Sequence, residues 1–318
     1  MGLRHRVSRA IHRVNGSTAV REHMTLHLAD LRTYVDRQHC ELKDYVDAAL
    51  GKYGTTDQLR ALYALVGRSH RNLLGDHESI EVLTDKPVAF DSPDHLVPWG
   101  TMRDNSANLW FNVKLGQWIP LPSLRVLDLG CSGGGFVKSV IDMGCLAVGI
   151  EGSDYSKLRR RAEWATIPNH LFTADITAPF SVVAGSQGRE PEPMKFSVIT
   201  AWEVIEHIRR DQLPAVFRNV DAHLEKNGVM IMSVSPNPDF INDVALHQTV
   251  EGQDWWLAEC ERNGFVHHEA VVEYFGNDWV RGGADADGSF HVALTRRGEP
   301  LYAELPVSGS PASRETGS

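Results

Sequence analysis

Long apolar segments and paired cysteines are both missing from this sequence. No uncharged apolar run approaches the ~20 residues that a membrane-spanning helix needs, so we expect no transmembrane segment. The four cysteines (Cys40, Cys131, Cys145 and Cys260) form no C-x-x-C pair and have no regular spacing. This pattern predicts reduced thiols in a cytoplasmic protein.

Basic residues are also scarcer than acidic ones. The chain has 32 Lys and Arg against 41 Asp and Glu, which gives a net charge of −9. A protein whose main task is to bind phosphates is usually basic, so nucleic acid is not an expected partner. Hydrophobic residues make up 42% of the 318 residues, which is ordinary for a packed globular protein and excludes a fully disordered chain.

The N-terminal segment, residues 1–22, departs from this acidity. Residues 1–21 contain five arginines and no acidic residue. Apolar residues recur there at helical spacing, with arginines on the remaining face: Leu3, Val7, Ile11 and Val14. Such a basic amphipathic helix can lie on an anionic membrane surface, which would give peripheral contact with the inner face of the membrane through residues 1–21. A mobile tail or an acidic protein neighbour is the alternative.

A helical extension follows over residues 23–83. A heptad pattern with spacings of four and three runs through Met24, Leu28, Leu31, Val35, Gln38, Leu42, Tyr45 and Ala49. It predicts a long helix that either forms a homodimer through residues 24–49 or packs on the main domain. Gly51 and Gly54 end this helix, and a second one is expected over 57–74.

The rest of the chain divides into three parts. Residues 84–120 are rich in Pro, Trp, Asp and Asn and predict a loop-rich lead-in or substrate lid. Residues 121–298 alternate between strand and helix patterns, and the Ser/Pro/Gly-rich residues 299–318 predict a disordered tail. The expected strands are 124–129, 147–151, 170–173, 196–202, 228–235, 266–275 and 290–295, and the expected helices are 134–143, 157–165, 212–224 and 253–263. This alternation predicts an α/β fold with a Rossmann-like, doubly wound, mostly parallel sheet of seven strands.

The most specific pattern is a glycine-rich turn between the first of these strands and its helix. Apolar residues from Val126 lead into Gly-Cys-Ser-Gly-Gly-Gly, which allows the backbone to approach a ligand closely beside a helix N-terminus. Glu151 ends the next strand, where a carboxylate can accept hydrogen bonds from two ribose hydroxyls. The turn lacks clean G-x-G-x-x-G spacing, and a second acid, Asp175, follows the third strand, which argues against NAD.

Four motifs occur in order: Asp128-Leu-Gly-Cys-Ser-Gly-Gly-Gly135, Glu151, Ala174-Asp-Ile176 and Phe196-Ser-Val-Ile-Thr-Ala-Trp-Glu-Val-Ile-Glu-His207. Over roughly residues 120–235 they resemble class I S-adenosylmethionine-dependent methyltransferases. The resemblance implies S-adenosylmethionine as cofactor. It would place the methionine part along Gly130, Ser132 and Gly134 with Asp128 near its amino group, the ribose at Glu151, and the adenine at Asp175 and Ile176. It also assigns Trp202 to this site.

The segment Glu203-x-x-Glu206-His207 offers two chemistries. On a helical turn these three side chains share one face, and with His247 they provide a ligand set for Mg²⁺ or Mn²⁺. A similar set holds magnesium in the small-RNA 3′-end 2′-O-methyltransferases. Alternatively, no metal binds: Glu203 then lies near the methionine part, His207 orients the turn, and His247 is a general base that takes the proton of an acceptor hydroxyl.

The acceptor is the least determined part of the prediction. Acids, amides, hydroxyls and an aromatic side chain mix over residues 90–106, which predicts sugar contacts through Trp99, Asp104 and Asn105 unless these residues only fix loop turns. This segment resembles, more loosely, bacterial methyltransferases of glycan clusters. We therefore expect O-methylation of a sugar or glycan hydroxyl. The alternatives are a quinone or other small-molecule O-methyltransferase, a non-catalytic cofactor-binding scaffold and an RNA 2′-O-methyltransferase.

Overall fold

The computed structural model describes residues 79–99, 104–185, 190–282 and 288–306. The segment 1–22, the heptad pattern at 24–49 and nearly all of the helical extension 23–83 lie outside the described residues, so the predictions made for them stay predictions. No helix in the described part of the chain is long and apolar enough to cross a membrane.

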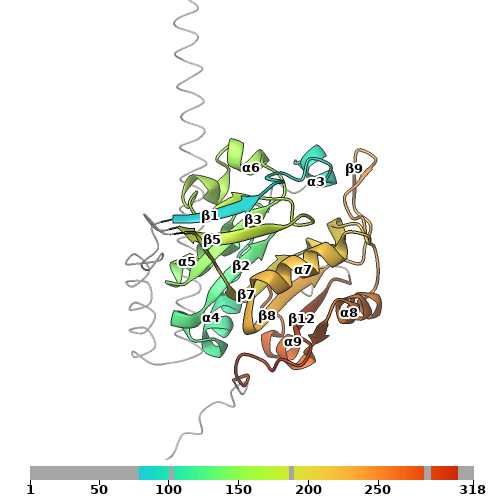
Figure 1. The fold of residues 1–318 in the computed structure, drawn as a ribbon. Helices are drawn as coiled ribbons and strands as arrows, with labels where there is room; N and C mark the ends of the chain where they lie inside the picture. Colours follow the sequence, from blue (N-terminus) through green and yellow to red (C-terminus); the bar gives the residue numbers. More distant parts are fainter. Residues whose placement is uncertain (1–78, 100–103, 186–189, 283–287, 307–318) are drawn as a thin grey trace, which may run out of the picture. The chain divides into compact units, whose positions relative to one another are not determined.

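A seven-stranded sheet forms the centre of the fold, as predicted (Figure 1). Its strand order is β11 (Phe265–His267), β12 (Phe290–Arg296), β8 (Leu224–Val234), β7 (Phe196–Trp202), β2 (Arg125–Leu129), β3 (Leu146–Glu151) and β4 (Leu171–Thr173). The strands from β8 to β4 run parallel, whereas β12 pairs antiparallel with both β8 and β11. All seven residues of β7 are buried, as expected of a strand covered on both faces.

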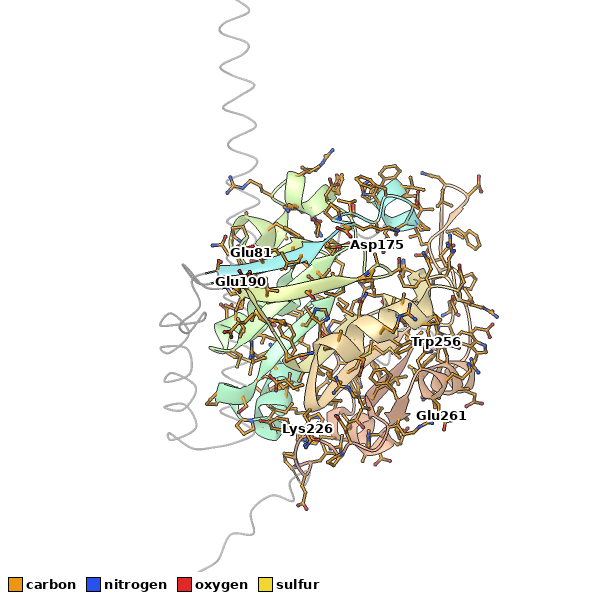
Figure 2. All side chains as sticks on the ribbon, in the orientation of Figure 1. Glu81, Asp175, Glu190, Lys226, Trp256 and Glu261 are labelled. Atoms are coloured by element: carbon orange, nitrogen blue, oxygen red, sulfur yellow. The ribbon has the colours of Figure 1, made fainter. Side chains whose placement is uncertain are left out.

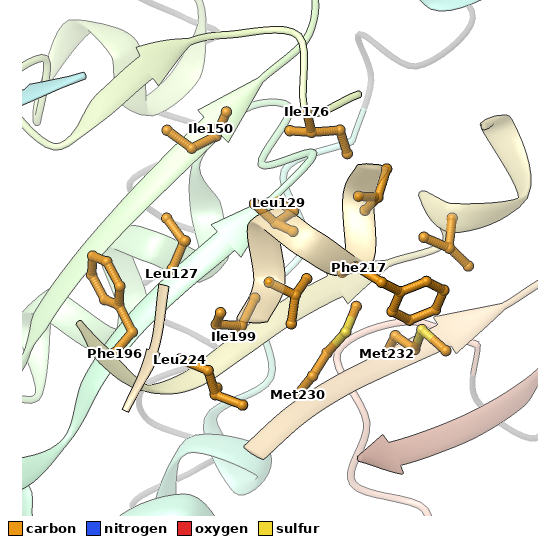
Figure 3. Close-up of a cluster of buried hydrophobic side chains, with 14 of the residues drawn as sticks. Leu127, Leu129, Ile150, Ile176, Phe196, Ile199, Phe217, Leu224, Met230 and Met232 are labelled. Atoms are coloured by element: carbon orange, nitrogen blue, oxygen red, sulfur yellow. The ribbon is translucent and has the colours of Figure 1, made fainter. Parts of the chain in front are cut away.

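Helices cover both faces of this sheet, and alternate strand residues supply the two cores. On one face, Leu127 and Ile199 pack in a cluster with α7 (Leu213–His223) and α8 (Gln253–Arg262). Figure 3 shows the Phe217 ring of α7 beside Met230 and Met232 of β8. On the other face, a second cluster joins the sheet to α4 (Leu109–Trp118), α5 (Gly135–Asp142) and α9 (Glu269–Phe275). The period of two along each strand produces both cores.

The lead-in segment contains more regular structure than predicted. Residues 109–118, expected in a loop-rich region, form α4, which Asn108 caps by accepting a hydrogen bond from Trp110 N at 2.9 Å. Residues 79–83, assigned to the helical extension, belong instead to β1 (Ser79–Thr84). This strand pairs antiparallel with β5 (Phe180–Gly185), which in turn pairs with β6 (Glu192–Pro193). Segment 85–94 follows β1 of this small sheet and ends inside the short helix α3 (Pro93–Leu96).

Two further predictions are corrected near the C-terminal end. Residues 266–275, expected as one strand, form the short β11 followed by α9, because Val271 and Phe275 are four residues apart and both bury on a helical face. Residues 299–306, expected in the disordered tail, pack on the core: Leu301 and Leu305 join the second cluster, and Trp118 Nε1 donates a hydrogen bond to Ala303 O at 3.0 Å.

The remaining short elements lie in the connections between the strands and helices of the main sheet. They are α6 (Tyr155–Leu158), the 3₁₀ helices η1 (Leu121–Ser123), η2 (Ala162–Ala165) and η3 (Ile205–His207), and the hairpin of β9 (Phe240–Ile241) and β10 (Val244–Ala245). The predicted helix over 157–165 is therefore split into α6 and η2. Positive φ angles at Arg160 (50°) and Ala162 (47°) separate the two elements.

Candidate active site

The glycine-rich turn between β2 and α5 adopts the left-handed backbone conformation at three positions. The φ angles are 73° at Gly130, 44° at Ser132 and 88° at Gly134. The backbone N–H groups of Gly130 and Cys131 both donate to Ile150 O, at 2.8 and 3.1 Å, which ties the turn to β3. A Cβ atom at Gly130 would overlap the side chain of Val204. Glycine is therefore required there by both φ and space.

A segment from earlier in the chain, residues 104–105, packs against the turn at Gly133 and Gly135. Gly133 N and Ser132 Oγ both donate to Asp104 O at 3.2 Å. A Cβ atom at Gly133 or Gly135 would overlap Asn105. The segment 104–105 therefore lies across the turn. This corrects the predicted sugar contact at Asn105, whose side chain contacts the glycine turn and does not line the cleft.

A cleft of about 560 Å³ opens at the carboxyl ends of the parallel strands, the usual ligand position in a doubly wound sheet. Most of the predicted site residues line it: Gly130, Ser132, Glu151, Asp175, Ile176, Trp202, Glu203, His207 and Asp104. The remaining predicted site residues do not line the cleft: Asp128, Gly134, Asn105, Glu206, His247 and the half-exposed Trp99. Segment 85–94, which belongs to the stretch predicted as a lead-in or substrate lid, forms a further wall.

Glu151 connects the second strand to the glycine turn. Its Oε2 accepts a hydrogen bond from Ser132 N at 2.7 Å, and its Oε1 accepts one from Ser153 N at 3.2 Å. Burial raises the pKa of this carboxyl, and the two backbone hydrogen bonds oppose that rise. Glu151 therefore supports the turn in addition to facing the cleft, where the prediction places a ribose.

Asp128 lies beneath the turn and not in the cleft. Its side chain is 2% exposed, and its Oδ1 accepts a hydrogen bond from Thr200 Oγ1 at 2.7 Å. Burial raises the pKa of Asp128 to about 8, because the charged form loses its hydration. In this structure Asp128 stabilises the strand and the turn from below, and its expected position near the amino group of a cofactor stays a prediction.

Asp175 and Ile176 form the opposite end of the cleft, at the edge of the sheet where the parallel strands end (Figure 2). Asp175 Oδ1 accepts hydrogen bonds from Thr177 N at 2.9 Å and Thr177 Oγ1 at 2.6 Å. Asp175 N donates to Lys86 O at 2.9 Å, which joins this end to segment 85–94. The two predicted adenine contacts are thus close together and accessible from the cleft.

Trp202 ends β7 and Glu203 follows it, and both line the cleft. The Trp202 indole packs edge-on against Phe111 and Phe136, with ring centroids 5.0 and 5.6 Å apart. Glu203 has a φ of 52°, unusual for a residue with a side chain. Its N–H donates to Ser233 O at 3.1 Å and to Ser233 Oγ at 3.0 Å. The Glu203 carboxylate is paired with an arginine and is not part of the candidate metal-ligand group formed by the two residues that follow in the motif.

The Glu203 carboxylate forms an ion pair with an arginine, Arg281, that sequence reasoning missed. Arg281 lines the cleft and places Nη2 2.6 Å from Glu203 Oε2 and Nη1 2.7 Å from Asp104 Oδ2. No motif points to Arg281, because it follows α9 in a short Val-Arg-Gly-Gly segment far from both partners in sequence. Only the folded chain brings these three side chains together.

Glu206, His207 and His247 form a separate cluster. Their candidate ligand atoms all lie within 4.8 Å of one another, so the structure brings together three of the four predicted metal ligands and leaves Glu203 out. Glu206 is fully buried: its Oε1 accepts a hydrogen bond from Ser235 N at 2.8 Å, and its Oε2 has no partner among the described residues. Burial raises the pKa of Glu206 to about 7.

The two histidines of this cluster are each oriented through Nδ1. His207 Nδ1 lies 3.0 Å from Asp94 Oδ2, and His247 Nδ1 contacts Asn237 O. Burial lowers the pKa of His207, but the Asp94 carboxylate more than compensates, so this pKa lies above its usual value. Burial lowers the pKa of His247. Of the two histidines, His207 lines the cleft. The His247 ring packs edge-on against the His207 ring, with ring centroids 4.7 Å apart.

Comparison with known proteins identifies the family. Residues 101–274, more than half of the chain, match the model of a methyltransferase domain. The chain belongs to this methyltransferase family. The family confirms the predicted class, and its matched range contains the glycine turn, Glu151 and the Glu203–His207 motif of this methyltransferase.

Individual relatives match shorter parts of the methyltransferase. It is 30% identical over 100 residues to the ubiquinone biosynthesis O-methyltransferase of Burkholderia vietnamiensis, a match that covers 30% of this chain and 40% of that protein. The enzyme of the same name from Thiobacillus denitrificans is 27% identical over 96 residues, which cover 29% of this chain and 38% of that protein. Each match thus spans about two fifths of the relative.

Solved methyltransferase structures are similar over a larger share of the chain. The CcbJ methyltransferase from Streptomyces caelestis has 13% sequence identity and a TM-score of 0.40, over 59% of this chain and 88% of that one. The glycopeptide N-methyltransferase MtfA in complex with S-adenosyl-L-methionine has 13% identity and a TM-score of 0.39, over 60% and 88%.

Proposed function

We propose that this chain is an S-adenosylmethionine-dependent O-methyltransferase that methylates a sugar or glycan hydroxyl. The observation that carries the proposal is that one cleft contains both the glycine turn with Glu151 and a histidine, His207, that a carboxylate orients. The first group of residues suits a nucleoside cofactor, and the second suits removal of a proton from an alcohol.

The cofactor part of the proposal rests on the fit of the lining residues. Glu151 ends β3 and faces the cleft, where its carboxylate can accept ribose hydroxyls. Asp175 and Ile176 at the next strand end would contact the adenine, and the turn at Gly130 leaves the backbone exposed to the methionine part. S-adenosylmethionine, when bound, supplies an electrophilic methyl group on a sulfonium.

His207 is the proposed general base. Because Asp94 engages Nδ1, Nε2 is the ring nitrogen left to accept the hydroxyl proton. The acceptor oxygen forms a bond to the methyl carbon, the carbon–sulfur bond breaks, and the proton moves to His207 Nε2. General-base assistance of this kind contributes typically ~10²–10⁴ in rate. This assigns to His207 the role that sequence reasoning favoured for His247, which packs behind it and outside the lining of the cleft.

A divalent cation is a second candidate for the same cluster. Glu206 offers a buried oxygen without a partner in the described structure, and both histidines are held at Nδ1 by an oxygen, the usual outer contact of a metal-binding histidine. Mg²⁺ or Mn²⁺ bound there would act as a Lewis acid toward the acceptor hydroxyl. Calorimetric titration of Mn²⁺ into wild type and His247→Ala decides this point: heat of binding that only the wild type shows supports the metal, and turnover that survives EDTA supports the base alone.

The acceptor is inferred from the cleft wall around His207. Gln212, Gln248, Asp91 and Asp94 line it, and amide and carboxylate groups suit the hydroxyls of a sugar. A catechol or quinol hydroxyl is the second candidate acceptor, because the ubiquinone-pathway relatives favour it and because Phe90, 61% exposed, also lines the cleft.

Transfer of a labelled methyl group separates these acceptors. The protein is incubated with labelled S-adenosylmethionine and with nucleotide sugars, oligosaccharides, catechols, quinols or RNA. We expect label in a sugar product with the wild type and strongly reduced label with His207→Asn, while Arg218→Gln, a surface change on α7, serves as the matched control. Label only in catechol or quinol products would replace the acceptor class. Cofactor binding without label in any product would support the non-catalytic scaffold.

A further inference from the structure

The cleft contains a row of three alternating charges at the end nearest the glycine turn. The guanidinium of Arg281 lies between the carboxylates of Asp104 and Glu203, at 2.7 and 2.6 Å. All three side chains line the cleft together with Gly130 and Ser132. The order of charges is negative, positive, negative, and the set carries a net charge of −1.

Each member of this row is fixed by the fold. Asp104 Oδ1 accepts hydrogen bonds from Ser106 N at 3.0 Å and Ser106 Oγ at 2.6 Å, which leaves Oδ2 for the arginine. Glu203 is held by its backbone at Ser233, and Ser289 Oγ donates to its Oε1 at 3.3 Å.

The backbone of Arg281 is anchored on both sides. His291 Nε2 donates to Arg281 O at 2.8 Å, and the His291 ring stacks on Trp279 with centroids 4.0 Å apart and planes 8° apart. Asn108 Nδ2 donates to Trp279 O at 2.8 Å. The guanidinium is therefore presented to the cleft in one orientation, at little entropic cost on binding.

We propose that Arg281 binds the α-carboxylate of the methionine part of the cofactor, and that the flanking carboxylates of Asp104 and Glu203 receive its α-ammonium. An α-amino acid group carries one negative and one positive charge on adjacent atoms, which complements this row. Two of the five guanidinium N–H donors serve the two carboxylates, so donors remain for a third. This inference rests on the proposed cofactor and adds the residue that recognises its amino acid end.

Arg281 is better suited to this task than the other cations of the cleft. Of the Lys and Arg residues in the described lining, Lys86 is 64% exposed and Arg209 is 58% exposed, whereas Arg281 is 34% exposed. A charge-assisted hydrogen bond is stronger where water is partly excluded. Lys86 also lies at the opposite end of the cleft from the glycine turn, where its Nζ is 3.8 Å from Asp175 Oδ2.

Two ligands that differ only in the amino acid group test the proposal. S-adenosylhomocysteine carries this group, whereas 5′-methylthioadenosine has the same nucleoside and thioether without it. In calorimetry, Arg281→Met is expected to weaken S-adenosylhomocysteine binding by about 10- to 100-fold and to leave the affinity for 5′-methylthioadenosine unchanged. Arg218→Met removes the same charge from the exposed face of α7, outside the cleft, and should change neither affinity.

A second pair of ligands isolates the carboxylate. Arg281→Met should weaken S-adenosylmethionine but not its decarboxylated analogue, which keeps the ammonium. Circular dichroism of each variant checks the fold. Equal losses for both members of either pair would reduce Arg281 to a structural contact and overturn the inference, as would no loss at all. If the wild type binds none of the four ligands, the proposed function itself fails, together with the inference that depends on it.

Discussion

The substitution Asp128→Asn tests the electrostatics beneath the glycine turn. Asp128 is 2% exposed and is bonded by Thr200, and its pKa in the folded chain is raised to about 8 from an ordinary value near 3.8. Asparagine has nearly the same shape, can accept the same Thr200 hydrogen bond and carries no charge at any pH. The variant therefore removes the ionisation while keeping the volume of the side chain.

The expected effect follows from proton linkage. Between pH 4 and 8 the folded chain keeps the Asp128 proton and the unfolded chain loses it, so the free energy of unfolding falls as pH rises through this window. Each pH unit well inside the window is worth at most ~1.4 kcal/mol. Between pH 5 and pH 8, wild type should therefore lose about 3 to 4 kcal/mol relative to Asp128→Asn. All other groups titrate in both proteins and cancel in the difference.

Urea unfolding followed by tryptophan fluorescence at pH 5, 6.5 and 8 measures this difference, and equal m-values show that the two proteins unfold alike. The surface variant Asp142→Asn, at a side chain that is 56% exposed, is the control and should show no such trend. A wild-type-to-variant gap that stays constant from pH 5 to pH 8 would refute the raised pKa of Asp128.

Three further substitutions test the site and the core. Glu151→Ala should weaken cofactor binding by ~1.5–3 kcal/mol in calorimetry, and unchanged affinity in a folded variant would reject the ribose assignment. Gly133→Ala should lower the unfolding free energy by ~1–3 kcal/mol in urea, because its Cβ would overlap Asn105; adding Asn105→Gly should restore part of the loss, and no recovery would place the strain elsewhere. Phe111→Ala should lower the unfolding free energy by ~3–5 kcal/mol in the same assay, since this fully buried ring stacks on Phe275 with ring centroids 4.5 Å apart. A loss below ~1 kcal/mol would show that the aromatic cluster contributes little to stability.

The sequence was informative wherever a feature depends on residues that are neighbours in the chain. Six of the seven strands of the main sheet follow from short apolar runs, whereas β11 is much shorter than the strand predicted there. The glycine turn follows the first of these strands, and Glu151 ends the second. These predictions hold because strand and turn formation are decided over a few residues. The approximate helices at α5, α7 and α8 were found for the same reason.

Features that depend on contacts between distant segments were not predicted. Strand β1 exists because it pairs with β5, about one hundred residues later, and neither segment shows that pairing in its own pattern. Asn105 was assigned to a substrate for its side-chain chemistry, but its position against Gly133 and Gly135 gives it a packing role. A residue type indicates what a side chain can bind, and only the fold decides what lies beside it.

Arg281 depends on contacts between distant segments, and its pairing with Glu203 limits the possible chemistry of the Glu-x-x-Glu-His motif. It lies beyond the last residue that the family model matches, and segment 85–94 lies before the first, so segments on both sides of the matched range complete the cleft. Arg281 engages Glu203 at 2.6 Å, so in the proposed arrangement that carboxylate serves the methionine end. A metal in the adjacent cluster would then have Glu206, His207 and His247 as its ligands among the described residues. The strained backbone at Glu203, with its φ of 52°, separates the two tasks. In the proposed arrangement, the first residue of the Glu-x-x-Glu-His motif thus faces the cofactor end, and the last, His207, faces the acceptor.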